Sequence, residues 1–414
     1  MKNIFTMIVL AAVLSLNAGA HRWAGGDISL LPEYEYAGAQ YKTPEGKPIA
    51  DLLPWLHDEG MNAMRVRLFV NPADYKGADA DPNACQTLEY IIPLCRRIKE
   101  AGMDLLLDFH YSDTWADPAK QWTPEAWSEL TDEELFVRIY DYTKETLLTL
   151  KSEGIVPDFI QPGNEISYGM LWGPYGTPEA DLKKTFMGSA KNWERLGWLL
   201  QRAIDACREV CPEAGIIIHT ERTASREEQR NFYDWMTTLD VDYDIIGLSY
   251  YPYFHGPLTS LDDSIGSLEE RYPDKRIMVV ETGYSYAWEV PGTSEKPEYP
   301  YTEAGQAQFA SDLVTMLEKH PGVEGLFWWW LEYNAYGTSL SGWYNAPLFD
   351  SRSGKATAAL RIIASFADGY SGLLEMPFQQ SGEDALYDLK GRRIMRPVVG
   401  EAYIREGRVI IRRE

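Results

Sequence analysis

The chain has 414 residues, of which 45% are hydrophobic, and a formal net charge of −23. The length allows one large domain or two modest ones, and the acidic balance disfavours nucleic acids, anionic membrane surfaces and polyanionic polymers as partners. The 14 Trp and 26 Tyr residues are typical of grooves that hold flat-faced ligands such as sugars, although large cores also use them. A neutral polymer therefore fits the composition better than a charged one.

The first twenty residues have the pattern of a secretory signal peptide. Lys2 supplies a positive charge, Ile4 to Leu16 form an apolar core, and Ala18-Gly19-Ala20 offers small residues for cleavage. The apolar core is too short for a comfortable membrane span, and no later stretch approaches the length of one. We therefore expect a chain that is exported to the periplasm, the cell surface or the medium, without membrane insertion.

Apolar, β-rich runs recur along the chain with helical stretches between them. Most are continuous apolar runs, the pattern of parallel strands that are buried on both faces. The helical stretches at 88–101, 132–153 and 192–210 stop at Gly102, at Gly154 and before Pro212. The predicted strands are Trp23–Leu30, Ala63–Val70, Met103–Phe109, Phe159–Gln161, Gly215–His219, Ile245–Tyr251, Ile277–Val280 and Gly325–Trp330.

This alternation of eight strands with helices, over about 330 residues, predicts a (β/α)8 TIM barrel. A doubly wound open sheet is the competing architecture. It is disfavoured because no Gly-x-Gly-x-x-Gly turn follows the first strand. We expect the barrel to occupy residues 21–368, after a signal peptide at 1–20.

From about Tyr370 the pattern changes to short alternating strands with a Glu-Gly turn and several Arg residues. These segments are Leu386–Ile394 and Glu401–Arg413. They predict a small β tail at residues 369–414. The tail resembles the C-terminal tails of many exported Bacteroidetes proteins.

The cysteines are Cys85, Cys95, Cys207 and Cys211. The last two lie four residues apart on one helical face, where the Cα atoms are roughly 6 Å apart and the Cβ vectors are poorly aimed for a disulfide. The set also lacks the paired short spacings of a zinc site. We expect buried thiols.

Polar or aromatic residues lie at the carboxyl end of every predicted strand. The loops at the carboxyl ends of barrel strands form the active site in this fold, and packing alone would not require such residues there. The residues at these ends are Asp27, Arg65, Arg67, Asp108, His110, Asn164, Glu165, His219, Tyr250, Tyr251, Glu281 and Trp328–Trp330.

Two carboxylates are the candidate catalytic pair. Glu165 ends the fourth strand and Glu281 ends the seventh, and these strands face one another across an eight-stranded barrel. Convergence of two carboxyl groups on one bond is the requirement of glycoside hydrolysis, and a separation of about 5 to 5.5 Å would indicate a nucleophile and retention of configuration. Two separate, solvated ion-pairing Glu residues are the alternative, which their matching strand ends and polar surroundings disfavour.

Neighbouring residues have expected roles beside this pair. Arg65 can hydrogen-bond Glu281 and lower its pKa, and Tyr251 can do the same through its hydroxyl. Asn164 is placed to bind a sugar 2-hydroxyl, and Trp329 offers a stacking surface. An ordinary barrel ion pair, a core Tyr and a Trp that fills the barrel end are the alternatives.

The dense stretch from Asp108 to Asp117 is a second polar patch. A metal is conceivable from its Asp and His residues, but His110 lacks a second His at ligand spacing. Sugar contacts by His110, Asp113 and Trp115 therefore fit better than a transition-metal site. Trp172, in the aromatic loop at 166–176, and His219 are further candidate substrate contacts, and no cofactor is expected.

Seven short motifs occur in order along the chain: Gly26–Ser29, Asn62–Phe69, Asp108–Pro118, Gly163–Ile166, Gly247–Pro252, Val279–Thr282 and Gly325–Trp329. Through these motifs, residues 22 to 365 resemble glycoside hydrolase family 53. The resemblance implies a retaining clan A enzyme, an endo-β-1,4-galactanase acting on the galactan side chains of pectin, with Glu165 as acid/base and Glu281 as nucleophile. It implies surrounding roles for Arg65, His110, Asn164, Tyr251 and Trp329.

The chain departs from the family pattern in two places. Trp330 stands where members often have Glu, which leaves one substrate contact or loop anchor unassigned. The segment Glu289–Glu298 lacks the Asp, His and Asn pattern of a calcium loop, so no calcium is expected there. Another clan A activity, such as a β-mannanase or xylanase, and a non-catalytic glycan-binding barrel are the competing functions. We expect a monomer.

Overall fold

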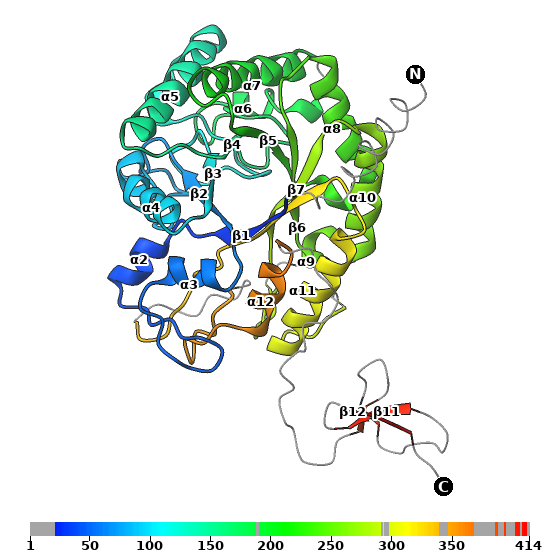
Figure 1. The fold of residues 1–414 in the computed structure, drawn as a ribbon. Helices are drawn as coiled ribbons and strands as arrows, with labels where there is room; N and C mark the ends of the chain where they lie inside the picture. The colour runs from blue at the N-terminus through cyan, green and yellow to red at the C-terminus, as the bar shows by residue number, and fades with distance from the viewer. Residues whose placement is uncertain are drawn as a thin grey trace, which may run out of the picture. The chain divides into compact units, whose positions relative to one another are not determined.

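Eight strands, each parallel to its neighbours, close into a barrel (Figure 1). Their order round the barrel follows the chain, and the first strand pairs with the last. Closure excludes the open doubly wound sheet and confirms the predicted (β/α)8 fold. The strands are β1 (Trp23–Asp27), β2 (Ala63–Leu68), β3 (Asp104–Phe109), β4 (Phe159–Pro162), β5 (Gly215–Thr220), β6 (Ile245–Tyr250), β7 (Arg276–Thr282) and β8 (Val323–Trp328).

The computed structural model describes residues 21–187, 190–290, 293, 298–338 and 347–367, and four short strands beyond them. The predicted signal peptide lies outside the described residues. The chain divides into two units, Met1–Tyr370 and Ser371–Glu414. None of the described helices combines the length and apolar character that crossing a membrane requires.

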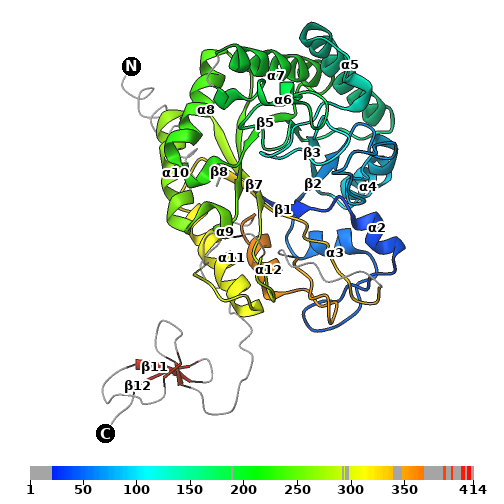
Figure 2. The ribbon, with the colours of Figure 1, turned by 180° about the vertical axis from the view of Figure 1, so that it is seen from behind.

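Helices surround the barrel (Figures 1 and 2), and the three helical stretches predicted from sequence correspond to α4, α5 and α7 below. The helices are α2 (Leu31–Tyr36), α3 (Leu52–Asp58), α4 (Leu88–Glu100), α5 (Asp132–Ser152), α6 (Pro178–Asp181), α7 (Ala190–Val210), α8 (Arg226–Thr238), α9 (Pro252–His255), α10 (Leu258–Arg271), α11 (Glu303–Leu317) and α12 (Ala358–Ala364), with short 3-10 turns η1 (Glu125–Trp127), η2 (Thr185–Met187) and η3 (Arg222–Ala224).

Local sequence explains where α5 begins and ends. Thr131 accepts a hydrogen bond from the backbone N–H of Glu134, and the Glu134 side chain accepts one from the backbone N–H of Thr131, which is a capping box. Ile139 and Leu150 are among the residues that it buries. Gly154, with a φ of 76°, supplies the left-handed conformation that ends the segment.

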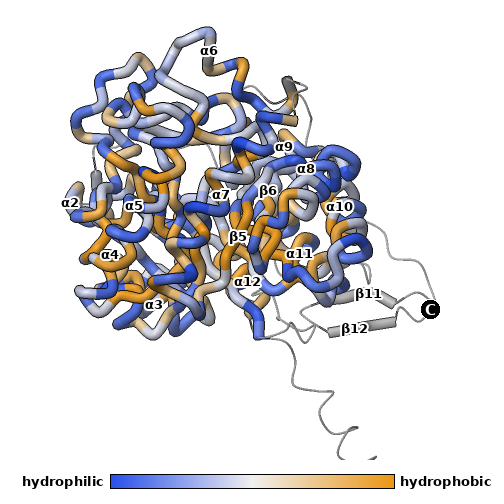
Figure 3. Tube along the Cα trace, turned by 90° about the horizontal axis from the view of Figure 1, so that it is seen from above, coloured by the Kyte–Doolittle hydropathy of each residue, from blue (hydrophilic) through white to orange (hydrophobic). Residues whose placement is uncertain are grey.

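The core has an inner and an outer layer. Figure 3 shows hydrophobic colour in β5 and β6 and hydrophilic colour on the outer helices α8 and α10. At Gly25 a Cβ would lie 1.6 Å from the carbonyl oxygen of Ala63, so only glycine allows β1 to pair with β2 at this point. The inner layer, inside the barrel, consists of Ala63, Leu106, Phe159, Ile217, Ile245, Met278, Val280 and Phe327, with Trp23 packed against it.

The second unit holds a four-stranded antiparallel sheet in the order β10-β9-β11-β12. Its strands are β9 (Leu386–Tyr387), β10 (Arg393–Ile394), β11 (Ala402–Arg405) and β12 (Arg408–Ile411). They lie within the two segments in which the sequence predicts short strands.

All four cysteines lie among the described residues and are free thiols, as predicted. Cys95, Cys207 and Cys211 are buried, as predicted, whereas Cys85 is partly exposed, so the prediction of buried thiols was wrong for this residue. Burial raises the pKa of the Cys95 thiol to about 12, which makes it unreactive near neutral pH.

Candidate active site

The two candidate carboxylates meet at the carboxyl ends of the strands. Glu165 follows β4, and Glu281 lies one residue before the end of β7. One carboxylate oxygen of each, together with a ring nitrogen of His219, lie within 4.8 Å of one another. Glu165 has a φ of 46°, a region that costs a residue with a Cβ roughly 1 to 2 kcal/mol. Backbone strain at this position is typical of a functional site.

Glu281 is held by a cation and a hydroxyl. Its Oε2 atom lies 3.5 Å from Nη1 of Arg65, and its Oε1 accepts a hydrogen bond of 2.8 Å from the Tyr251 hydroxyl. Both partners, and the lowering effect of each on the pKa of Glu281, agree with the sequence-based expectation. Burial raises the pKa of Glu281 to about 7, and Arg65 and Tyr251 only limit this rise.

Glu165 has neutral partners and carboxylate neighbours. Its Oε1 accepts a hydrogen bond of 2.6 Å from the Ser249 hydroxyl. Burial, followed by the charges of Glu281 and Glu221, raises the pKa of Glu165 well above its ordinary value. Glu281 has the Arg65 cation beside it, whereas Glu165 has the Ser249 hydroxyl, so the surroundings favour ionisation of Glu281 and retention of the proton on Glu165. Two carboxyl groups in such different environments are the arrangement of an acid and a nucleophile.

Arg65 is the central cation of the site. Its side chain is fully buried and donates to Asp27 Oδ2 at 3.1 Å, Asp108 Oδ2 at 2.7 Å and Asn164 Oδ1 at 2.7 Å. A buried guanidinium needs such partners because desolvation of a charge is costly. These contacts fix Arg65 beside Glu281.

Asn164 has a fixed amide orientation. Its Oδ1 accepts from Arg65, and its Nδ2 donates to the carbonyl oxygen of Ala116 at 2.8 Å. These two bonds distinguish the oxygen from the nitrogen of the amide. Nδ2 carries a second N–H, and the expected contact of Asn164 with a sugar hydroxyl stays a prediction.

An aromatic wall lies close to Arg65, the cation beside Glu281. The rings of Trp115 and Trp329 are half-buried, and their centroids are 5.9 Å apart. The guanidinium of Arg67 lies 4.6 Å from the Trp115 ring and 4.8 Å from the Trp329 ring, within the range of a cation–π interaction. Arg67 is itself fully buried and lies 3.3 Å from Asp27. The wall is therefore supported from behind by a fixed cation.

Trp330, the position at which the sequence departs from the family pattern, is a packed anchor. It is 4% exposed, has a φ of 56°, and its Nε1 donates to the Tyr34 hydroxyl at 2.6 Å. Two residues later, the fully buried Glu332 accepts from the backbone N–H of Leu30 at 2.8 Å. Burial, followed by the charge of Asp27, raises the pKa of Glu332 to about 8.

The polar side chains after β3 mainly bind other protein groups. His110 is 2% exposed; its Nδ1 accepts from the backbone N–H of Ala116 at 3.1 Å, and its Nε2 lies 3.1 Å from Asp108 Oδ2. Asp113 accepts from the backbone N–H groups of Asn71 at 2.9 Å and Glu125 at 2.8 Å. Its carboxylate therefore joins two loops.

Two further predicted substrate contacts are inaccessible in this structure. Trp172 is fully buried, and its Nε1 donates to the carbonyl oxygen of Tyr168 at 3.0 Å. His219 is also fully buried, with both ring nitrogens occupied by protein groups. These side chains hold the loop after β4 and the base of the site, whereas a substrate contact would require exposed surface.

Two polar residues of the site are absent from the sequence-based prediction. Ser249, on β6, contacts both Glu165 and His219, and Gln161, on β4, contacts both Asp108 and His219. Both are fully buried. Ser249 lies in the quoted motif Gly247–Pro252, and its inward-facing position in a strand was the available signal.

A metal has one candidate location within the described part of the chain, the group Glu165, His219 and Glu281. The ring nitrogens of His219 are already hydrogen-bonded to Gln161 and Ser249, so this ring would have to release a partner to bind an ion. Most of the segment 289–298, in which no calcium was expected, lies outside the described residues.

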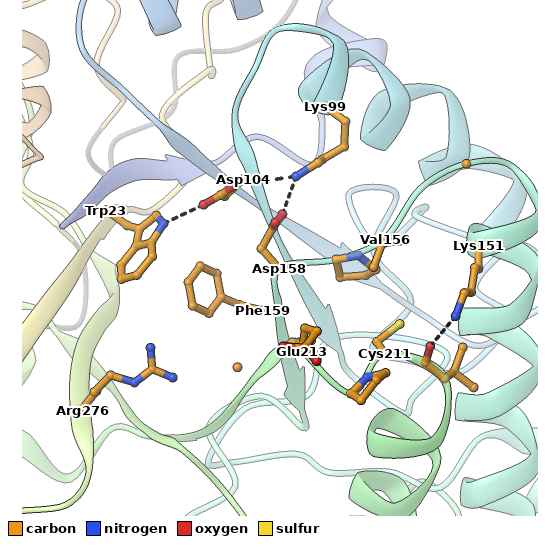
Figure 4. Close-up of a pocket in the computed structure, with 16 residues that line it drawn as sticks. Trp23, Lys99, Asp104, Lys151, Val156, Asp158, Phe159, Cys211, Glu213 and Arg276 are labelled. Atoms are coloured by element: carbon orange, nitrogen blue, oxygen red, sulfur yellow. Dashed lines mark hydrogen bonds and ion pairs between the residues drawn. The ribbon is translucent and has the colours of Figure 1, made fainter. Parts of the chain in front are cut away.

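A cavity of about 680 Å³ lies at the opposite end of the barrel. Its lining includes the first residues of several strands, such as Trp23, Asp104 and Arg276. Figure 4 shows three of its charged groups paired with protein atoms: Lys99 with Asp158 at 2.6 Å, and the Asp104 carboxylate with Trp23 Nε1 at 2.8 Å. Residues at this end of a (β/α)8 barrel usually serve stability.

Comparison with known proteins agrees with this geometry. The model of the family described as Glycosyl hydrolase family 53 matches residues 23–363. The arabinogalactan endo-beta-1,4-galactanase of Cellvibrio japonicus is 33% identical over 84% of this chain and 92% of that protein. A protein of Niallia circulans, named only by its position in a 5' region, is 38% identical over 80% of this chain and 90% of its own length.

Two solved structures are similar in sequence and fold. The GH53 catalytic domain of Ignisphaera aggregans is 31% identical, with a TM-score of 0.71, and the match covers 84% of this chain and 97% of that domain. A fungal beta-1,4-galactanase is 29% identical, with a TM-score of 0.68, and the match covers 83% of this chain and 99% of that enzyme.

Proposed function

The chain belongs to glycosyl hydrolase family 53, and from this membership we propose that it is an endo-acting β-1,4-galactanase that cleaves the galactan side chains of pectin with retention of configuration. The observation that supports this mechanism is the approach of Glu165 and Glu281 oxygens to within 4.8 Å. Retaining enzymes hold their carboxyl groups about 5 to 5.5 Å apart, whereas inverting enzymes separate them by about 6.5 to 9.5 Å to admit a water molecule.

In the first step, a carboxylate oxygen of Glu281 attacks the anomeric carbon while Glu165 donates its proton to the glycosidic oxygen. The bond from the anomeric carbon to the leaving sugar breaks, and a glycosyl ester of Glu281 forms. In the second step, Glu165 takes a proton from water, the water oxygen bonds to the anomeric carbon, and Glu281 leaves as a carboxylate. Both residues return to their initial states.

The surroundings of the carboxylates support this division of roles. The nucleophile must be ionised, and Glu281 has the Arg65 cation at 3.5 Å and the Tyr251 hydroxyl at 2.8 Å. The acid must be protonated, and Glu165 has a neutral hydroxyl as its hydrogen-bond partner and other carboxylates nearby. The same residue type thus has two different environments.

Substrate binding is assigned to the aromatic wall and to Asn164. We place a galactosyl ring against Trp329 and Trp115, whose half-buried faces offer apolar surface to the sugar C–H groups. The second N–H of Asn164 is assigned to the 2-hydroxyl, a contact that strengthens in the transition state. A neutral galactan is compatible with the net charge of −23.

The proposal extends to the organisation of the chain. Residues 1–20 are assigned as a signal peptide that is removed on export, residues 21–368 as the catalytic barrel, and residues 369–414 as a small β tail. A monomer is sufficient, because every residue assigned to catalysis comes from one barrel.

Product analysis tests this function. The chain without residues 1–20 is incubated with potato galactan, with mannan and with xylan, and the anomer released first from galactan is identified by NMR. We expect galacto-oligosaccharides in the β configuration from galactan alone. Absence of release from galactan would refute the activity, and first release of the α anomer would refute retention.

Azide rescue separates the two carboxylates. In Glu165→Ala, azide needs no general base and is expected to attack the glycosyl ester and give a β-galactosyl azide. In Glu281→Ala, azide replaces the nucleophile and is expected to give an α-galactosyl azide. The opposite assignment of the two products would exchange the proposed roles.

A further inference from the structure

Ser249 links the candidate acid to a buried histidine. Its hydroxyl oxygen lies 2.6 Å from Oε1 of Glu165 and 2.8 Å from Nε2 of His219. Ser249 and His219 are both fully buried. A hydroxyl has one hydrogen, so it donates to one of these neighbours and accepts from the other. The direction of the two hydrogen bonds determines whether Ser249 donates a hydrogen bond to Glu165 or accepts one from it.

The other side of the His219 ring determines this direction. Nδ1 lies 3.1 Å from Gln161 Nε2 and 3.3 Å from the backbone N–H of Glu165. The Gln161 nitrogen is identified by a second bond of 2.6 Å, which it donates to Asp108 Oδ1. Two N–H groups facing Nδ1 require that atom to be unprotonated, so the neutral ring carries its hydrogen on Nε2 and donates it to Ser249.

The competing tautomer is less well satisfied. Asn164 Oδ1 lies 3.1 Å from Nδ1 of His219 and would accept a hydrogen placed there. That oxygen already accepts from Arg65 at 2.7 Å, and a hydrogen on Nδ1 would face two N–H donors. Burial, followed by the charge of Arg65, lowers the pKa of His219 well below its ordinary value, so the ring remains neutral.

We propose that Ser249, oriented by His219, is a positioning residue for Glu165, whose Oε1 it occupies as a donor so that the catalytic proton resides on Oε2. This inference rests on the proposed function, in which Glu165 is the acid/base. A proton on Oε1 would face the Ser249 hydrogen, which has no other acceptor among the described residues while the Ser249 oxygen accepts from His219. Oε2 is therefore the oxygen that presents the proton to the leaving group.

The same bond acts during proton transfer. When Glu165 gives its proton to the glycosidic oxygen, the negative charge spreads over both carboxylate oxygens, and the Ser249 bond becomes charge-assisted and stronger. The hydroxyl therefore stabilises the product of the transfer more than its reactant. That difference accelerates the step for a leaving group that needs protonation.

The pH dependence of Glu165 follows from the groups that face it. Burial raises the pKa of Glu165 most, and the charges of Glu281 on β7, Glu221 after β5 and Asp117 after β3 raise it further. The hydrogen bond from Ser249 on β6 lowers it. Removal of the Ser249 hydroxyl therefore raises the pKa of Glu165. The basic limb of the pH–rate profile is expected to move to higher pH.

Leaving-group dependence tests the inference. Values of kcat/KM are measured for Ser249→Ala on galactan and on a dinitrophenyl β-1,4-galactobioside, whose leaving group needs no proton. We expect a loss of about 10- to 100-fold on galactan and less than about threefold on the activated substrate. Ser249→Thr, which keeps the hydroxyl, is expected to restore most of the activity on galactan. Ser264→Ala, which removes a buried hydroxyl of α10, is the matched control.

Each outcome decides between positioning and mere packing. Equal losses on both substrates, or no loss on galactan, would overturn the inference, as would a basic limb that does not move. Should Ser249→Ala fail to fold, Ser249→Cys supports the same comparison with a weak donor of similar shape. If the unsubstituted enzyme does not hydrolyse galactan, the proposed function fails and this inference fails with it. That result differs from equal losses on both substrates, or no loss on galactan, in the Ser249→Ala variant, which would overturn this inference alone.

Discussion

Tyr251→Phe removes one hydrogen bond from the proposed nucleophile and leaves the ring in place. The phenol donates to Glu281 Oε1 at 2.8 Å, and both residues are 7% exposed. A buried hydrogen bond to a charged group contributes about 1.5 to 3 kcal/mol, which corresponds to about one to two pKa units. Because the bond stabilises the ionised form of Glu281, its loss should raise the pKa of Glu281 above about 7.

The sign of the effect on activity follows directly. Glu281 attacks as a carboxylate, so activity is lost as pH falls through its pKa, and a higher pKa moves the acidic limb toward higher pH. The basic limb reports Glu165 and should move little, so the bell-shaped profile narrows. On the acidic side, kcat/KM should fall by about 10- to 100-fold.

The assay is kcat/KM on galactan across the pH range, measured for the unsubstituted enzyme and the variant. Tyr250→Phe is the control, because that buried hydroxyl donates to the carbonyl oxygen of Gly256 at 2.9 Å and contacts neither carboxylate. An acidic limb that stays in place in Tyr251→Phe, or moves equally in the control, would refute the assignment of that limb to Glu281.

Three further substitutions test other parts of the site. Glu332→Gln should stabilise the fold at pH 7 by on the order of 3 kcal/mol and have little effect below pH 4.5, because burial raises the pKa of Glu332 to about 8 and the folded state holds a proton that the unfolded chain loses above pH 4.5. Urea unfolding at pH 4 and pH 7 measures this difference, and an equal effect of the substitution at both pH values would contradict it. Arg67→Met removes the cation behind Trp115 and Trp329 and should raise KM for galactan with both pH limbs unmoved, so an unchanged KM would argue against the aromatic wall. Asp113→Ala removes the charged acceptor of two backbone N–H groups and should lower the free energy of unfolding by about 1 to 3 kcal/mol, with the pH profile unchanged as the check on its indirect role.

The barrel was predictable because continuous apolar runs mark strands that are buried on both faces. The ends of the strands were less predictable. The first predicted strand reached Leu30, whereas β1 ends at Asp27, where the backbone N–H of Ser29 bonds back to the Asp27 carboxylate at 3.1 Å. Apolar character continues through this turn, but strand pairing does not.

The seventh strand differs in the opposite direction. It was predicted to end at Val280, but β7 runs on to Thr282, with a register shift between Val279 and Thr282 where it pairs with β8. Glu281 therefore lies within a strand, at an irregularity that re-aims its side chain. Such an irregularity depends on pairing between distant segments, so the local sequence does not reveal it.

Residue type and strand position were enough to place Arg65 and Tyr251 beside Glu281. They did not establish how deeply each side chain lies. His219 and Trp172 were expected at the substrate, but the layers of side chains within and above the barrel cover both completely. Ser249 was overlooked because its inward-facing position in the strand does not by itself reveal its partners, which come from other strands.

One continuous series of polar contacts connects Glu281 to Glu165. The groups that contact these two carboxylates differ in charge. At one end the guanidinium of Arg65 lies beside Glu281, and at the other the neutral Ser249 contacts Glu165. A cation favours an ionised carboxylate much more than a hydroxyl does. The series keeps its single cation beside Glu281, and its members nearest Glu165 are the neutral His219 and Ser249, which is how two glutamates in one site can serve as nucleophile and acid. The contacts run in the order Glu281, Arg65, Asp108, Gln161, His219, Ser249 and Glu165.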